Sequence, residues 1–166
     1  MKPHLVPLAC LALALPACQA DRPDPGTEQA VAIVEATADP AQLTYHPDLG
    51  INVAEMQRFP SGILYRDLEL GTGDSLRTGD RAAVTYTGWL PDGTRFDTNV
   101  GADPYLYVVG AGEVIQGWDL GLLGMQPGGR RQLILPHEMG YGAQGSGPIP
   151  PFSVLVFEVE LREILR

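Results

Sequence analysis

The side chains that could do chemistry in this sequence are mostly aromatic, and the usual catalytic sets are missing. Both cysteines, Cys10 and Cys18, lie near the N-terminus, and His46 and His137 stand far apart in the sequence. There is no glycine-rich phosphate loop and no metal-ligand spacing. His137, beside Pro136 at the end of an expected strand, is interpreted as a surface loop residue rather than a ligand or a general base. No metal and no cofactor are therefore expected.

Nine aromatic side chains are concentrated in segments that we expect to converge. Aromatics on strands usually belong to a core, but two of these have a context that a core does not explain. Tyr141 lies in the loop MGYGAQGSGPIPPF, whose glycines and prolines favour a recess at the surface. Phe96 is followed directly by Asp97, a carboxylate that would be costly to bury. The chemistry favoured by this pattern is the binding of an apolar group. The nine residues are Tyr86, Trp89, Phe96, Tyr105, Tyr107, Trp118, Tyr141, Phe152 and Phe157.

The elements that must position these aromatics are short strands, which begin after Phe59. Alternating runs bounded by Gly, Pro and Asp are typical of a mainly antiparallel sheet. Strands are expected in GILYRDLELGTGD, on both sides of the turn PDG in DRAAVTYTGWLPDGTRFDTN, in PYLYVVG and in RRQLILP. The last segment, SVLVFEVELREIL, alternates most clearly. Its expected core residues are Leu155, Phe157, Val159 and Leu161, and its expected water-facing residues are Glu158, Glu160 and Arg162.

One helix is expected in this region, from Glu113 to about Leu123, within EVIQGWDLGLLGM. Its apolar residues have helical spacing, yet Gly117 and Gly121 each cost about 1 kcal/mol relative to alanine. A curved sheet around a single helix brings backbones close, and glycine lacks the Cβ atom that would hold them apart. Gly124 is expected to cap the C-terminal end. The predicted fold class is α+β, with one antiparallel sheet whose apolar face is covered by one short helix.

The first residues predict an exported protein. The apolar run from Leu5 to Leu15 is too short to span a bilayer and suits a secretory leader. The sequence LPAC, which ends at Cys18, resembles the lipobox of bacterial lipoproteins, although Pro16 departs from the usual small or aliphatic residue. We expect residues 1–17 to be a signal peptide and Cys18 to be lipidated. The alternative is a plain signal peptide cut after Ala20, which would leave a soluble periplasmic protein.

Proline-broken polar stretches predict a flexible acidic tether and lead-in over residues 18–58, followed by a folded domain over residues 59–166. AVAIVEATA, residues 30–38, could form one short helix, which is too short for a long dimerisation helix, so a monomer is expected. Without Lys2, 10 arginines face 20 acidic residues, and the formal charge is −10. An acidic chain without a basic patch does not favour nucleic acid. Contact with a membrane is expected only through the lipid anchor.

Four motifs in order and spacing are similar to the FKBP family of peptidyl-prolyl isomerases, the rotamases that bind the macrolide tacrolimus. They are VTYTGWLPDGTRFDTN, VIQGWDLGLLGMQPGGRRQLILP, YGAQGSGPIPP and LVFEVEL. The match covers about residues 61–166, nearly two thirds of the chain. The resemblance implies a half-barrel sheet wrapped around one helix, with an apolar pocket for the proline ring between them. Two rim loops are each one residue shorter than in the small human-type members, and the loop from Thr98 to Asp103 offers no arginine near Asp97.

The resemblance also implies which residues would form the site. Tyr86, Asp97, Tyr141 and Phe157 would be the catalytic residues. The substrate-binding residues would be Phe96, Tyr105, Val114, Ile115, Trp118 and Ile149, with Trp118 as the floor of the pocket. The expected partners are proline-containing polypeptides, with tacrolimus-like macrolides as inhibitors.

The implied function is isomerisation of Xaa-Pro bonds in exported proteins, which assists their folding on the periplasmic side of the bacterial envelope. Gln19 after Cys18 resembles the signal for outer-membrane retention. The alternative is a catalytically weak FKBP-like module that binds or chaperones envelope proteins through the same groove. The full set of aromatics favours the enzyme, because a docking domain does not need a complete pocket.

Overall fold

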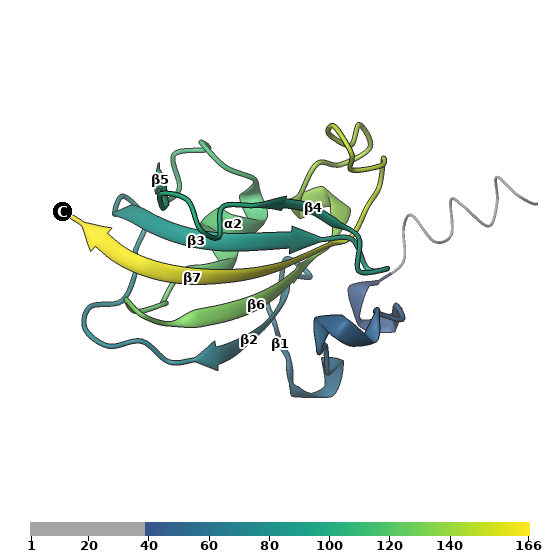
Figure 1. Ribbon diagram of the computed structural model, residues 1–166, viewed down its shortest axis with the longest axis horizontal. Helices are drawn as coiled ribbons and strands as arrows, with labels where there is room; N and C mark the ends of the chain where they lie inside the picture. Colours follow the sequence, from purple (N-terminus) through teal and green to yellow (C-terminus); the bar gives the residue numbers. More distant parts are fainter. Residues whose placement is uncertain (1–38) are drawn as a thin grey trace, which may run out of the picture.

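The computed structural model describes residues 39–166, in which seven strands form one antiparallel sheet (Figure 1). The strand order is β1-β2-β6-β7-β3-β4, and β5 pairs with β3. The strands are β1 Gln57–Arg58, β2 Leu64–Glu69, β3 Arg81–Trp89, β4 Arg95–Thr98, β5 Tyr105–Val108, β6 Arg130–Leu135 and β7 Leu155–Leu165. The predicted fold class, a curved antiparallel sheet with one short helix, is confirmed. The expected signal peptide, the lipidation site and the helix at residues 30–38 lie outside the described residues.

Helical structure within residues 39–166 is limited to short segments. One α-helix, α2, spans Gln116–Gly121, and four 3₁₀ helices span Pro40–Gln42, Pro47–Leu49, Val53–Glu55 and His137–Met139. In this part of the chain no helix has the length and hydropathy needed to cross a bilayer.

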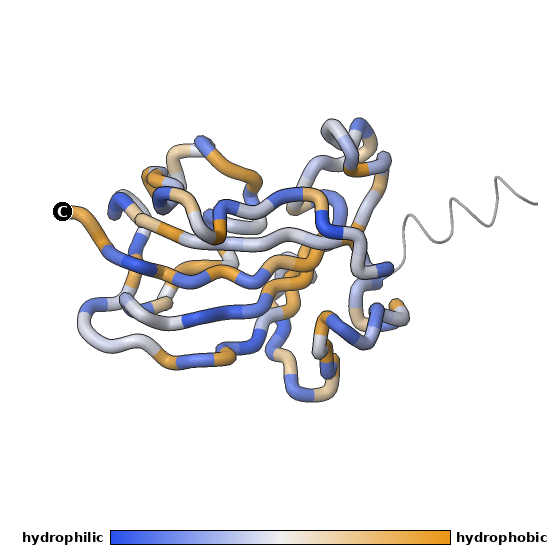
Figure 2. Tube along the Cα trace, in the orientation of Figure 1, coloured by the Kyte–Doolittle hydropathy of each residue, from blue (hydrophilic) through white to orange (hydrophobic). Residues whose placement is uncertain are grey.

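Strand β7 is the centre of the fold because it pairs with both β6 and β3. Its four predicted core residues are each at most 2% exposed and face α2, so the predicted alternation is confirmed. Val156 on the opposite face is also fully buried. The outer face is therefore covered only at the Val156 end of the strand, whereas the predicted water-facing residues Glu158 and Glu160 are half-buried and Arg162 is exposed. Strand β6 changes in hydropathy along its length, from its hydrophilic Arg130 end to its hydrophobic Leu135 end (Figure 2).

Helix α2 is shorter than the sequence predicts, because Ile115 has an extended ψ of 144° and the helix begins after it. The expected close approach at the two glycines is confirmed. A Cβ atom on Gly117 would lie 2.5 Å from Leu135 Cδ1 of β6, and one on Gly121 would lie 3.0 Å from a Leu133 methyl carbon. Gly124 is not the cap: the helix ends at Gly121 with Leu122 as its C-cap, and the N–H of Gly124 donates to the carbonyl of Leu76.

Arg131 attaches the end of α2 to the sheet. Its guanidinium donates to the carbonyl oxygens of Gly121, at 2.8 Å, and Leu123, at 3.1 Å, and forms an ion pair with Asp67 at 2.6 Å. It also lies over the ring of Tyr65, 4.6 Å from the centroid. Carbonyls in the last turn of a helix lack partners in the helix and favour a cation. This contact fixes the position of α2 and therefore of Trp118.

The segment from residue 39 to residue 58, the lead-in, packs on the outer face of the sheet, so the prediction that it is flexible is wrong. Its apolar side chains cover a second cluster built from Leu64, Ile134, Val154 and Val156. The Tyr45 hydroxyl donates to a lead-in carbonyl at 2.6 Å. In the hydropathy colouring, apolar positions interrupt the polar lead-in (Figure 2). The lead-in side chains in this cluster are Ala41, Leu43, Tyr45, Leu49, Ile51, Val53 and Met56.

Polar contacts hold the lead-in at several points. Gln132 of β6 donates to the carbonyl of Leu49 at 2.8 Å. Arg66 of β2 forms an ion pair with Glu55 at 2.7 Å, and β1 pairs with β2. The sequence analysis missed this packing because Pro40 and Pro47 interrupt the segment, which forms short 3₁₀ turns instead of strands, although the apolar side chains at 41, 43 and 45 and at 49, 51 and 53 alternate. The folded unit therefore includes residues 39–58, whereas the sequence placed its start at residue 59.

Candidate functional site

A cavity of about 480 Å³ opens between β3, β4, β5, the start of α2 and the loop after β6. Nine of the ten pocket residues implied by the sequence line it, together with two that the sequence did not single out. The lining residues are Tyr86, Phe96, Asp97, Tyr105, Gly112, Glu113, Val114, Ile115, Trp118, Tyr141 and Phe157. Segments up to 71 residues apart in the chain are thus brought to one recess.

The floor and walls of the cavity are aromatic rings packed edge to face. Trp118 is only 4% exposed, and its ring centroid lies 4.8 Å from that of Tyr86 and 5.5 Å from that of Phe157. Phe96 meets Phe157 at 5.5 Å, also edge to face. Such geometry is favourable for aromatic quadrupoles and leaves ring faces available to an apolar ligand. The arrangement is a preformed apolar recess.

Gly88 of β3 is required for this packing. A Cβ atom there would lie 2.6 Å from Phe96 Cζ and 2.8 Å from Phe157 Cε1, closer than side chains tolerate. This role could not be read from the sequence, since a glycine in a strand ordinarily marks a bulge or a close backbone approach. The register of β3 and β4 does shift between Gly88 and Trp89, and Gly88 also lets the rings of Phe96 and Phe157 approach the backbone of β3.

The polar side chains of the cavity include three tyrosine hydroxyls, those of Tyr86, Tyr105 and Tyr141, and two carboxylates, those of Asp97 and Glu113. The Tyr86 hydroxyl donates to Asp97 Oδ2 at 2.6 Å, and Asp97 Oδ1 accepts from the backbone N–H of Thr98 at 2.8 Å. Burial raises the pKa of Tyr86, and its hydrogen bond to Asp97 raises it further. Burial, and then the charge of Asp97, raise the pKa of Tyr141. The hydroxyls of Tyr86 and Tyr141 therefore stay protonated at neutral pH.

Several donors at the cavity have no protein acceptor within residues 39–166. They include the Tyr141 hydroxyl, on a residue 37% exposed, the backbone N–H of Ile115 and the buried indole N–H of Trp118. Ile115 immediately precedes α2, where the N–H groups of a helix lack carbonyl partners in the helix. These donors can bind carbonyl oxygens of a polypeptide that enters the cavity.

Three positions differ from what the sequence predicts. Ile149 is 6% exposed and belongs to the core, where its backbone exchanges two hydrogen bonds with Ser146, and it does not line the cavity. The side chain of His137 is only 15% exposed because Phe152 packs on its edge at 5.3 Å, so the surface interpretation is wrong. Glu113 lines the cavity and was missed, although its place directly before Val114 was a usable signal.

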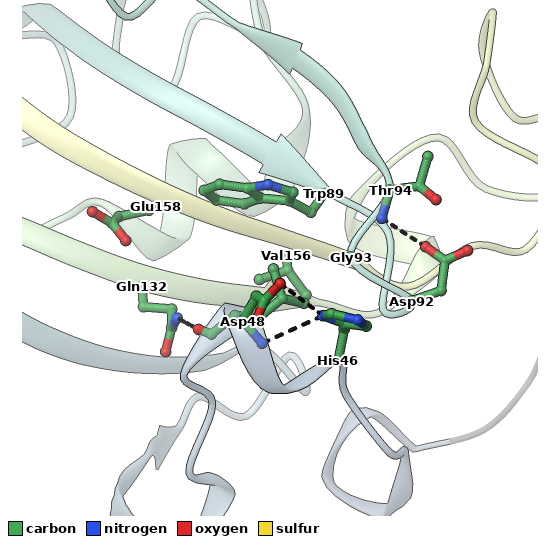
Figure 3. A pocket seen from close by; sticks show the side chains of 10 residues that line it. His46, Asp48, Trp89, Asp92, Gly93, Thr94, Gln132, Val156 and Glu158 are labelled. Carbon is green, nitrogen blue, oxygen red and sulfur yellow. Dashed lines mark hydrogen bonds and ion pairs between the residues drawn. The ribbon is translucent and has the colours of Figure 1, made fainter.

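A second cavity, of about 470 Å³, lies on the outer face of the sheet, between the lead-in and the β3–β4 turn (Figure 3). Trp89 forms one wall, but three carboxylates, those of Asp48, Asp92 and Glu158, also line it. The labelled His46 lies against Asp48, 3.6 Å from its carboxylate (Figure 3). An apolar ring would meet charged walls here, so this cavity is a weaker candidate for a proline site.

Within the described 39–166 range, no group of three or more His, Cys, Asp or Glu side chains could hold a metal ion. The chemistry of the first cavity is enclosure of an apolar group, with donors for the carbonyls on either side of it. Fold and site together define a small α+β domain that binds polypeptide around an apolar residue.

The comparisons assign this domain to a family. The family described as FKBP-type peptidyl-prolyl cis-trans isomerase matches residues 73–162. An FK506-binding protein of Neisseria meningitidis serogroup B is 47% identical over 105 residues, which are 62% of this chain and 96% of the relative. The chain belongs to the FKBP-type peptidyl-prolyl cis-trans isomerase family.

Two further relatives show how much of this chain, and how much of each relative, the similarity covers. A crystal structure of a peptidyl-prolyl cis-trans isomerase from Pseudomonas syringae superposes with a TM-score of 0.61 and 30% identity, covering 84% of this chain and 92% of that one. FK506-binding protein 4 of Chaetomium thermophilum is 42% identical over 118 residues, 71% of this chain. The aligned part is only 23% of that relative, so the similarity is to one domain of a longer protein.

Proposed function

We propose that this protein catalyses cis-trans isomerisation of Xaa-Pro bonds in exported polypeptides and so assists their folding in the bacterial envelope. The observation that carries the proposal is the preformed aromatic cavity with unpaired donors at its edge. Membership of the isomerase family and the names of the relatives, which are FK506-binding proteins, support it. A tacrolimus-like macrolide would occupy the same cavity.

The reaction requires no acid, base or nucleophile. Rotation about a prolyl amide is slow because resonance must be broken at the perpendicular state, with a barrier of about 18–20 kcal/mol. The twisted amide has lost the charge separation of the planar form. An apolar enclosure disfavours the planar ground state relative to it, and a cavity shaped for the twisted form binds it preferentially.

Each group of the cavity has a place in this mechanism. The proline ring lies on the face of Trp118, with Phe96 and Phe157 as walls. The N–H of Ile115 and the hydroxyl of Tyr141 bind carbonyl oxygens on either side of the rotating bond. Asp97 fixes the Tyr86 ring through their 2.6 Å hydrogen bond and acts on the cavity electrostatically. No proton transfer is involved.

A protease-free isomerisation assay on a short Xaa-Pro peptide tests the proposal. Faster relaxation of the peptide supports the enzyme. The alternative is a catalytically weak binding or chaperone module, and peptide binding without acceleration would favour it. No second function is favoured by a specific observation of the cavity.

We predict that Tyr86→Phe and Asp97→Asn each lower kcat/KM about tenfold, because a loss of 1.36 kcal/mol in transition-state binding is about tenfold in rate. Both changes keep the shape of the side chain. Tyr86→Phe removes the donor of the hydrogen bond, whereas Asp97→Asn removes the charge and leaves one amide oxygen for two donors, Tyr86 and Thr98. The double variant should lose little more than either single variant, since groups that act as a unit are not additive. Tyr45→Phe, which removes a hydroxyl in the lead-in, is the matched control and should keep wild-type kcat/KM. If the losses in kcat/KM of the two single variants add in the double variant, Tyr86 and Asp97 do not act through one shared hydrogen bond.

We also propose that the protein is anchored by lipid at Cys18 and retained at the outer membrane. The support is the LPAC sequence with Gln19 after it, which lies outside the described residues. Fractionation of cells that produce the wild type or Cys18→Ser provides the test. We expect the wild-type protein in the membrane fraction and the Cys18→Ser variant in a different fraction. Equal release of both into the soluble periplasm would support the plain signal peptide instead.

A further inference from the structure

The charges that line the proposed isomerase cavity have one sign. Of its lining residues only Asp97 and Glu113 carry a full charge at neutral pH, and both are exposed. Asp97 accepts hydrogen bonds from Tyr86 and Thr98, and Glu113 Oε2 accepts from the N–H of Val108 at 2.9 Å. All these donors are neutral, so the two negative charges at the mouth are not compensated.

The arginines of the described part of the chain are concentrated elsewhere. Six of them form ion pairs, all with carboxylates outside the segment that runs from β4 to α2. The four carboxylates within that segment are at positions 97, 103, 113 and 119, and none of them is in an ion pair with a described residue. The paired arginines are Arg58, Arg66, Arg130, Arg131, Arg162 and Arg166.

The remaining arginines of residues 39–166, at positions 77, 81 and 95, do not line the cavity, and none of them forms an ion pair with a described carboxylate. Arg95 lies two residues before Asp97 in β4, and Arg81 of β3 pairs with Val108, whose N–H binds Glu113. Neither arginine is in an ion pair with the carboxylate on its side of the rim. A bound polypeptide therefore meets an acidic rim.

We propose that the cavity selects prolines that have a lysine or arginine within one or two residues of them. The inference rests on the proposed isomerase function and names its substrate class. Long basic side chains can extend their charge to the rim while the proline ring occupies the apolar floor. A cleft of one sign raises the local concentration of oppositely charged substrate and speeds its association, and salt screens the effect.

The experiment uses the mature chain and three peptides that are identical except for one position beside a common Leu-Pro, which is lysine, glutamine or glutamate. At low ionic strength we expect kcat/KM for the lysine peptide to exceed that for the glutamate peptide about tenfold, with glutamine between them. At 0.5 M salt the ratio should fall to about twofold, because the Debye length is then under about 5 Å.

Substitution of the two rim carboxylates tests whether they cause the preference for the lysine peptide. Glu113→Gln and Asp97→Asn should each lower the lysine-to-glutamate ratio by about twofold to threefold. The ratio is taken within one variant, so a general loss of activity cancels. Glu163→Gln, an exposed carboxylate of β7 that does not line the cavity, is the matched control and should keep both ratio and rate.

The outcomes separate this inference from the function on which it rests. Acceleration of the glutamine peptide with a lysine-to-glutamate ratio near one at low salt would overturn the charge preference and leave the isomerase intact. A ratio that persists unchanged in the Glu113→Gln, Asp97→Asn double variant would overturn its assignment to these two residues. No acceleration of any peptide by folded protein would overturn the isomerase proposal, and the preference with it.

Discussion

Removal of residues 39–58 together with everything before them is expected to lower the free energy of unfolding by about 4 kcal/mol. Full burial of an aliphatic side chain contributes about 1.5–3 kcal/mol, and the deletion would partly expose Leu64, Ile134, Val154 and Val156. It would also remove strand β1 and the Arg66–Glu55 ion pair. Denaturant unfolding followed by tryptophan fluorescence measures the loss.

The matched control is a chain that begins at Asp39 and keeps every contact of the described structure. Its stability relative to the chain that begins at residue 59 isolates the contribution of residues 39–58. Equal stability of the two truncations would show that the lead-in does not contribute to folding. Residues 39–58 lie outside the family match, which begins at residue 73, so the result cannot be anticipated from the family.

Phe157→Ala is expected to lower kcat/KM by more than tenfold, about 30-fold, corresponding to about 2 kcal/mol of transition-state binding. Phe157 is 2% exposed and contacts both Trp118 and Phe96, so the change removes a wall of the cavity. It should also lower stability by about 3–5 kcal/mol, as truncation of a buried phenylalanine usually does. Folding must therefore be confirmed by near-UV circular dichroism at the temperature of the assay.

Phe157→Leu separates the two effects. Leucine keeps most of the apolar volume, so the stability loss should be nearer 1.5 kcal/mol, while the lost edge-to-face contact should still reduce kcat/KM severalfold. A folded Phe157→Ala protein with wild-type kcat/KM would show that enclosure by this ring does not stabilise the twisted amide.

The sheet and helix could be predicted because their periodicity is undisturbed. The alternation in β7 identified all four of its inner-face residues, and the helical spacing around Trp118 identified α2. The ends of α2 were wrong because they depend on the backbone of Ile115 and on Arg131, which comes from another element. The spacing of apolar residues within the helix segment contains no information on either of these two determinants.

The candidate site was predictable to the extent that motifs carried it. Nine of ten implied residues line one cavity, whereas Ile149 lies in the core because the loop after Tyr141 folds back on itself through the Ser146 backbone. The function of Gly88 could not be predicted, since it depends on where two distant rings meet. The lead-in was missed for a related reason: its prolines break the alternation of its apolar residues into short pieces, and only the tertiary structure shows which surface they cover.

The cis-trans exchange rate of a Leu-Pro peptide at equilibrium distinguishes an isomerase from a docking module, when it is followed by NMR exchange spectroscopy with the protein far below the peptide concentration. Uncatalysed exchange takes tens of seconds or more. The isomerase proposal predicts exchange that is much faster, that rises in proportion to protein concentration, and that a tacrolimus-like macrolide abolishes. Unchanged exchange in the presence of folded protein that still binds the peptide would contradict it, and would identify the cavity as a docking site.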